Sequence, residues 1–182
     1  VREKSKKSTI LIAKINAFLS SYIPKKIIYC ASKSREVQES IGFNKAKGIV
    51  IPNGYDVASF TQNAEMGAAF RDEINISNNT FLLGHVGRDN PQKDHSTLIE
   101  SFSILREKKL NFHAVIIGTN LDNNNYELKK LLNHKNLQDH VLLLGRRSDI
   151  PFVMNGIDLF ILSSAFGEAF PNVLNESMAC GT

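Results

Sequence analysis

Apolar residues follow two kinds of pattern along this chain: stretches with helical spacing, and short runs that are apolar or β-rich throughout. In the first part these patterns predict a helix over residues 8–22 and a strand over 27–30. A second helix, capped by Ser32 or Ser34, is predicted to run to Ile41, and a strand follows over 48–51. Turn-forming residues begin at Pro52, and no strong periodicity follows up to Gln62, which is typical of a connection between domains. We therefore divide the chain into residues 1–51, a connection over 52–62, and residues 63–182.

The same alternation continues beyond the connection. The predicted strands lie at residues 81–86, 112–117, 141–144 and 157–162. The predicted helices cover residues 63–74, 94–109, 126–134, 149–155 and a last segment that starts at Pro171. Apolar strands that alternate with helices indicate an α/β fold, in which a parallel sheet is covered by helices on both faces. Ligands of such folds bind at the carboxyl ends of the strands, so the loops after these strands are where we expect a site.

Composition and charge narrow the class of protein. Of the 182 residues, 42% are hydrophobic and 22% charged, which excludes a disordered or collagen-like chain. No apolar run approaches the roughly 20 residues that a membrane-spanning helix needs, and the first residues do not resemble a secretory signal. Cys30 and Cys180 lie too far apart for a metal or redox spacing, so we expect a reduced, cytoplasmic setting.

The charge is unevenly distributed. Residues 1–50 hold 11 Lys and Arg against 3 Asp and Glu, a net charge of +8, whereas the rest of the chain carries −4. The basic part could contact an anionic membrane surface, which would place the protein at the inner face of the membrane, or a phosphate-bearing substrate. A solvated basic helix face explains it equally well. Nucleic acid is not expected as a partner, because the lysines are not interleaved with stacking aromatic residues.

The first candidate site follows the strand over residues 81–86. Gly87 lets a ligand approach the backbone, while Arg88 and Lys93 supply a forked donor and a point charge that suit a diphosphate. A solvated basic loop is the alternative. Of the neighbouring histidines, His85 is interpreted as a packed core residue, and His95 either approaches the phosphates or serves the first helical turn.

The second candidate site lies between Gly167 and Glu176. With Pro171 in the first helical turn, backbone N–H groups around Phe170 to Val173 would face the loop and favour an anion. Glu168 precedes this helix, and Glu176 lies inside it, so both carboxylates would suit sugar hydroxyls. We expect neither glutamate to have a raised pKa, and no Asp-x-Asp pair indicates a metal.

Several motifs in order resemble retaining family 4 glycosyltransferases. The motifs are Pro52-Asn53-Gly54-Tyr55-Asp56, Gly87-Arg88 with Lys93, Gly145-Arg146, Asp158 to Ser164, and Glu168-x7-Glu176 followed by Met178-Ala179-Cys180-Gly181-Thr182. The resemblance covers residues 47–182, and residues 1–46 are similar to the closing part of the family's N-terminal domain. It implies a Rossmann-like sheet, incomplete at its end, preceded by the end of a second Rossmann-like domain.

The resemblance also implies roles for individual residues. Arg88 and Lys93 would neutralise the diphosphate of a nucleotide-sugar donor, and Glu168 would bind hydroxyls of its sugar; these three are the predicted catalytic residues. The predicted donor-binding residues are Gly87, Arg146, Ala169, Phe170, Pro171, Asn172, Val173 and Glu176. Cations and a helix N-terminus can stabilise the leaving diphosphate in place of a metal, so no cofactor is expected.

The implied activity is sugar transfer to a saccharide or lipid-linked saccharide in bacterial polysaccharide or glycolipid synthesis. A nucleotide-sugar epimerase or hydrolase, and a non-catalytic nucleotide-sugar binding module, are the alternatives. Since the family continues beyond the position of Thr182 and has a larger N-terminal domain, we expect the 182-residue chain to be a truncated fragment that does not catalyse full transfer by itself.

Overall fold

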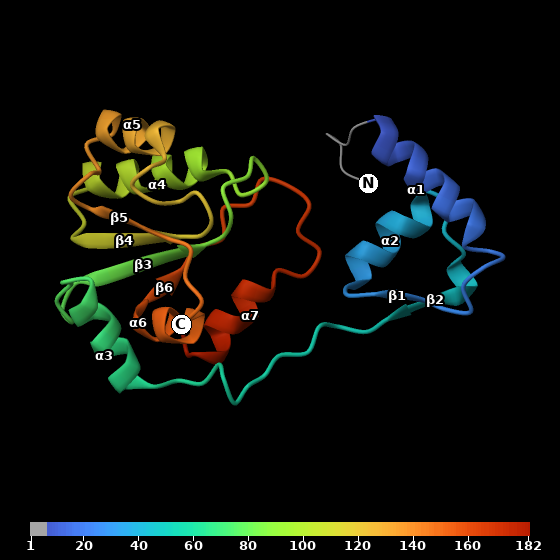
Figure 1. The fold of residues 1–182 in the computed structure, drawn as a ribbon, viewed down its shortest axis with the longest axis horizontal. Coiled ribbons are helices and arrows are strands. Elements are labelled where there is room, and N and C mark those ends of the chain that lie inside the picture. The colour runs from blue at the N-terminus through green and yellow to red at the C-terminus, as the bar shows by residue number, and fades with distance from the viewer. Residues whose placement is uncertain (1–6) are drawn as a thin grey trace. The chain divides into compact units, whose positions relative to one another are not determined.

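The computed structural model describes residues 7–182, which form two compact units (Figure 1). The first unit holds the chain up to Gly54 together with Phe166–Pro171. The second holds Tyr55–Ala165 and Asn172–Thr182. No helix within residues 7–182 is both long enough and apolar enough to cross a membrane.

The first unit is a small α/β element. Its helices and strands are α1 (Lys7–Leu19), β1 (Ile27–Tyr29), α2 (Ser32–Ser40), the 3₁₀ helix η1 (Lys45–Lys47) and β2 (Gly48–Val50). The two strands pair in parallel, with Tyr29 opposite Val50. The predicted serine cap of α2 is wrong, because Ala31 occupies the cap position and makes no side-chain hydrogen bond there.

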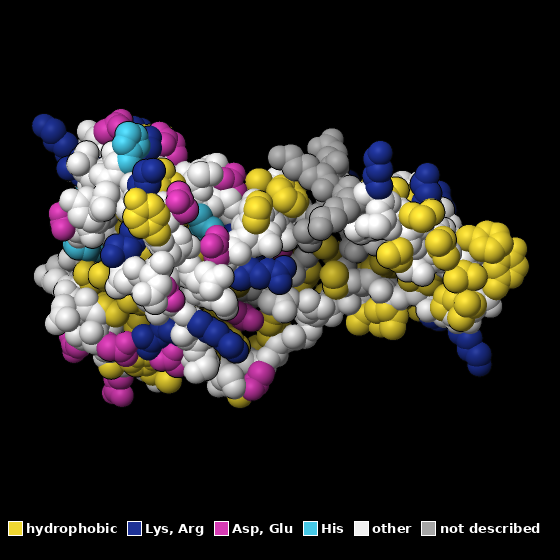
Figure 2. Space-filling model, turned by 45° about the horizontal axis from the view of Figure 1, so that its top comes forward, with side chains coloured by type: hydrophobic (Ala, Val, Ile, Leu, Met, Phe, Trp, Pro, Cys, Tyr) yellow, Lys and Arg dark blue, Asp and Glu magenta, His cyan; other side chains and the backbone are white. Residues whose placement is uncertain are grey.

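The outer face of α1 is apolar. The large hydrophobic side chains that are exposed on α1 and on the turn that follows it are Leu11, Ile12, Ile15, Phe18, Tyr22 and Ile23. Figure 2 shows hydrophobic side chains gathered on the visible surface of the first unit. Within α1 only Ala17 is buried. The helix therefore packs on its unit through a small residue and leaves its large side chains uncovered there.

The second unit is a four-stranded parallel sheet in the order β5-β4-β3-β6. The strands are β3 (Phe81–Val86), β4 (Phe112–Ile117), β5 (Val141–Gly145) and β6 (Leu159–Phe160). The helices are α3 (Ala64–Glu73), α4 (His95–Glu107), α5 (Tyr126–His134), α6 (Ile150–Gly156) and α7 (Asn172–Ala179). The predicted α/β class is confirmed, and the strands predicted at 81–86 and 112–117 have the observed bounds.

Helices cover both faces of this sheet (Figure 1), and each face has its own apolar core. On one face α4 and α5 pack through residues such as Phe102 and Leu132. On the other face α3, α6 and α7 pack through residues such as Phe70, Met154 and Cys180. Burial of two faces explains why the central strands are predominantly apolar at successive positions rather than at alternate ones.

The strand predicted over residues 157–162 is much shorter than expected. Only Leu159 and Phe160 pair with β3, opposite Leu83 and Gly84. The flanking residues still bond to β3 through the backbone, since the Asp158 amide donates to Leu82 at 2.9 Å and the Ile161 amide donates to Gly84 at 2.8 Å. The carboxylate Oδ2 of Asp158 also accepts hydrogen bonds from the Leu82 amide at 2.7 Å and from Arg71 at 2.6 Å.

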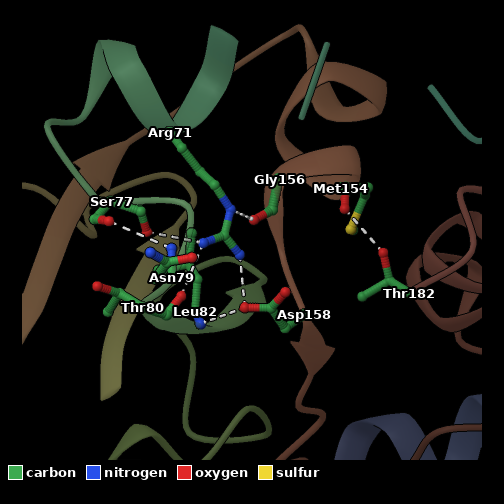
Figure 3. A network of polar contacts seen from close by, with 9 residues as sticks. All are labelled: Arg71, Ser77, Asn79, Thr80, Leu82, Met154, Gly156, Asp158 and Thr182. Atoms are coloured by element: carbon green, nitrogen blue, oxygen red, sulfur yellow. Dashed lines mark hydrogen bonds and ion pairs between the residues drawn. The ribbon is translucent and has the colours of Figure 1, made fainter. Parts of the chain in front are cut away.

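Arg71 is the centre of a buried polar network at the amino end of the sheet (Figure 3). From α3 its guanidinium donates to the carbonyl of Gly156 at 2.9 Å and to that of Thr80 at 2.8 Å, besides the carboxylate of Asp158. Five N–H donors in a planar fork let one arginine satisfy several carbonyls at once. The network joins α3, α6 and the edge strand β6.

Candidate functional site

The carboxyl ends of β3, β4 and β5 are tied together by backbone hydrogen bonds. The Gly87 amide donates to Ile117 at 2.9 Å, and the Gly118 amide donates to Gly145 at 2.8 Å. Gly118 has a φ of +152°, and a Cβ there would collide with the carbonyl of Gly87. Glycine at this position therefore brings the loops after β3 and β4 into contact, which builds the floor of the candidate site.

Arg88 and Lys93 both stand on the loop after β3, as predicted. Arg88 is exposed, whereas Lys93 is half-buried. The stem of Lys93 lies against Gly87: a Cβ on that glycine would be 3.3 Å from Lys93 Cγ and Cδ. The hydroxyl of Ser163, from the segment after β6, donates to the Lys93 carbonyl at 2.6 Å. Lys93 is thus positioned both by packing of its stem on Gly87 and by a hydrogen bond from the segment that follows β6.

Two buried histidines lie beneath this loop. His85 is 0% exposed, and its Nδ1 lies 3.0 Å from the carbonyl oxygen of Ile161. His95, the first residue of α4, meets it edge to face, with ring centroids 5.1 Å apart. Burial lowers the pKa of His85 to about 4 and also lowers the pKa of His95. The interpretation of His85 as a packed core residue is confirmed by its burial.

Arg146 and Arg147, which follow β5, have different surroundings. Arg147 donates to Glu73 at 2.6 Å and is also paired with Asp149, and its guanidinium lies over the ring of Phe70. These partners raise its pKa and fix it to α3 and α6. Arg146 is exposed. The sequence prediction chose the arginine whose side chain lies on the surface next to Gly145.

The segment with the second candidate site is divided between the two units. Glu168, Ala169, Phe170 and Pro171 lie on residues 166–171 of the first unit, whereas Asn172 and Val173 open α7 in the second. The helix begins at Asn172, one residue later than the predicted start at Pro171.

Tyr55 anchors the start of α7. Its hydroxyl donates to Asn172 Oδ1 at 3.2 Å and accepts from Asn175 Nδ2 at 3.0 Å. The sequence prediction included Tyr55 in a motif but gave it no role. A tyrosine among turn-forming residues was the available signal, but its partners lie more than a hundred residues away in the chain.

Glu176 differs from the prediction in its chemistry. Its side chain is half-buried, and burial raises the pKa of its carboxyl. The expectation that neither glutamate has a raised pKa is therefore wrong for Glu176. The sequence placed this residue on a helix but could not show that the helix turns it toward the protein.

A cavity of the second unit lies away from these residues. A cavity of about 530 Å³ borders Asp158 and Asn155, at the amino end of β6, and is also lined by Gln62 and Cys180. None of the predicted site residues lines it. Within residues 7–182 no cluster of three or more His, Cys, Asp or Glu side chains has an arrangement suited to a metal ion.

Comparison with known proteins decides the family. Residues 68–182, more than half of the chain, match the model of the glycosyl transferases group 1. The chain belongs to this family.

Two relatives extend the match beyond the family region. The chain is 31% identical over 170 residues to N-acetylgalactosamine-N,N'-diacetylbacillosaminyl-diphospho-undecaprenol 4-alpha-N-acetylgalactosaminyltransferase of Campylobacter jejuni, a match that covers 91% of this chain and 43% of the relative. It is 26% identical over 181 residues to UDP-Gal:alpha-D-GlcNAc-diphosphoundecaprenol alpha-1,3-galactosyltransferase of Escherichia coli, covering 97% of this chain and 46% of the relative. The chain thus spans less than half the length of these glycosyltransferases.

Solved structures share the fold. Anabaena Alr3699/HepE in complex with UDP and glucose superposes with a TM-score of 0.85 at 24% identity, over 95% of this chain and 47% of that one. WaaG, a glycosyltransferase involved in lipopolysaccharide biosynthesis, gives a TM-score of 0.74 at 21% identity, over 86% of this chain and 42% of that one. The predicted Rossmann-like fold class is therefore confirmed, while the roles of individual site residues stay predictions.

Proposed function

We propose that this group 1 chain is the donor-binding part of a retaining glycosyltransferase of family 4. It would transfer a sugar from a nucleotide-diphosphate sugar to a lipid-linked saccharide during bacterial cell-surface polysaccharide or glycolipid synthesis, in the cytoplasm. The names of the Campylobacter and Escherichia relatives support the acceptor class, since each name includes a saccharide linked to diphospho-undecaprenol. The Anabaena structure with UDP and glucose supports the donor class.

The observation that carries the proposal is the loop after β3. It carries two cations: Arg88 is exposed, and the stem of Lys93 lies against Gly87. Breakage of a glycosidic bond to a diphosphate develops negative charge on the leaving oxygen, and fixed cations stabilise that charge as it forms. The backbone N–H groups at the start of α7 lie at the positive end of the helix dipole and would also stabilise this negative charge. We propose that these groups act without a metal ion.

The two glutamates have complementary tasks in this proposal. Glu168 would bind hydroxyls of the donor sugar, and Glu176 those of the ribose. The half-buried position of Glu176 supports this, because a desolvated carboxyl gains more from a hydroxyl partner than an exposed one does. Removal of its side chain should therefore weaken nucleotide binding.

Calorimetric titrations of the chain with UDP, GDP and ADP test the donor site. We expect one nucleotide to bind, and Arg88→Ala and Glu176→Ala each to raise its Kd by about tenfold or more, the loss expected for a charge-assisted hydrogen bond. Arg106→Ala is the matched control, because Arg106 is an exposed arginine in the last turn of α4. Equal affinity in all four proteins would contradict the assignment. Donor turnover without an acceptor sugar would favour an epimerase or hydrolase.

We also propose peripheral contact with an anionic membrane. The basic charge of residues 1–50 and the exposed apolar face of α1, flanked by Lys7 and Lys14, support it. Lys4 and Lys6, which belong to the same predicted basic segment, lie outside the described residues. Charge reversal with Lys7→Glu and Lys14→Glu should lower sedimentation of the chain with anionic phospholipid vesicles but not with neutral ones. Unchanged sedimentation would remove the membrane from the proposal.

A further inference from the structure

His85 is the buried titratable group that the proposed chemistry leaves without a task. It occupies the next-to-last position of β3, directly before the loop with Arg88 and Lys93, and is 0% exposed. A side chain with two ring nitrogens is an unusual choice for a buried strand position that an aliphatic residue could fill, because a buried polar atom without a partner destabilises the folded state. The surroundings of the two nitrogens show what the imidazole contributes.

The Nδ1 side has a defined partner. A carbonyl oxygen only accepts hydrogen bonds, so the 3.0 Å contact with Ile161 requires that His85 Nδ1 carries the proton. The imidazole is then neutral, and its Nε2 is a bare acceptor. Within residues 7–182 that Nε2 is buried without a hydrogen-bond partner.

The Nε2 side faces the candidate site. A Cβ on Gly87 would lie 3.1 Å from His85 Nε2 and 3.3 Å from the Lys93 stem. The imidazole Nε2 and the lysine stem therefore both lie close to Gly87.

The segment after β6 connects the same two residues a second time. Ile161 accepts from His85, and two positions later Ser163 donates to the carbonyl of Lys93 at 2.6 Å. The amide of Ala165 also donates to Gln92 at 3.0 Å. Residues 161–165 thus run from the buried histidine to the loop. At the first end Ile161 is held by two bonds, the one from His85 to its carbonyl and the one from its own amide to Gly84 at 2.8 Å.

We propose that His85 is a positioning residue for the proposed donor site: its Nδ1–H bond to Ile161 helps to hold the segment that fixes Lys93, and its ring lies beside Gly87, against which the lysine stem also packs. The proposal rests on the proposed function, since it assigns Lys93 to the donor diphosphate. His95 packs against the ring edge to face and keeps the imidazole in this orientation.

Two substitutions of equal shape test the proposal. His85→Asn retains an N–H donor near the Nδ1 position, whereas His85→Leu has nearly the same branching but no donor. We expect the leucine variant to raise the Kd for UDP by about three- to tenfold, the worth of one hydrogen bond, and the asparagine variant to remain close to the parent. His113→Leu serves as the control for loss of a partly buried histidine, because His113 lies near the other end of the neighbouring strand β4.

A ligand-free measurement separates this proposal from the donor assignment. Nitrogen NMR of the chain should show a protonated Nδ1 and a bare Nε2 at His85, and amide exchange of Lys93 should accelerate in the leucine variant but not in the asparagine variant. If the parent shows these signals but does not bind UDP, the donor assignment fails and the positioning of the loop stands. A protonated Nε2, or equal loss of affinity in both variants, would overturn the role of His85.

Discussion

Acidification should destabilise the second unit through His85. Burial lowers the pKa of this histidine from 6.5 to about 4, and the charges of His95 and Lys93 act in the same direction, while the bond to the Ile161 carbonyl opposes them. The unfolded chain binds a proton near pH 6.5, but the folded chain does so only near pH 4. Unfolding therefore takes up a proton between these values, and the folded state loses stability as the pH falls through this window.

The size of the effect follows from the two pKa values. The difference between a pKa of 6.5 in the unfolded chain and about 4 in the folded chain corresponds to about 3 kcal/mol in the free energy of unfolding, at about 1.4 kcal/mol per pKa unit. This contribution of His85 to the free energy of unfolding is fully present above about pH 7 and is lost by about pH 4. His95 adds to it in the same direction, because burial also lowers its pKa.

Urea unfolding of the parent and of His85→Asn measures this difference. Asparagine cannot titrate, so the free energy of unfolding of the variant should depend less on pH between 4 and 6.5, by about 3 kcal/mol over the interval. His95 and all carboxylates are present in both proteins and cancel in the comparison. Because the chain has two units, amide exchange of β3 and β4 should be followed in parallel. The same pH dependence in both proteins would refute the reasoning.

Three further changes probe the second unit. Arg71→Leu should lower the free energy of unfolding by about 2 kcal/mol, because it leaves the carbonyls of Gly156 and Thr80 without this donor; a loss under about 1 kcal/mol would contradict the network. Gly118→Ala should prevent stable folding, seen as loss of a cooperative thermal transition, because its Cβ would overlap the carbonyl of Gly87. Cys180 should react with a thiol reagent at least about tenfold more slowly than Cys30, because Cys180 is buried and its pKa is raised; similar rates would show that α7 opens readily.

The sequence by itself determined the order of the elements and the loop that carries the cations. Strands 81–86 and 112–117 are correctly bounded because they are predominantly apolar runs that are each followed by a glycine. In a parallel sheet such strands place their following loops at one edge, so Gly87, Arg88 and Lys93 could be assigned to that edge from their position alone. Local spacing is sufficient for inferences of this kind, because they depend on the chain's own neighbours.

Only the tertiary structure decided which polar groups are buried and what they meet. The carboxylate of Asp158, directly before β6, is held by Arg71, which lies eighty-seven residues away in the chain. Glu176 has a raised pKa because α7 turns it toward the protein. His85 faces a carbonyl and a lysine stem that two other segments supply. The free energy of a polar side chain depends on desolvation and on partners distant in sequence, and neither is encoded in the periodicity of the residues beside it.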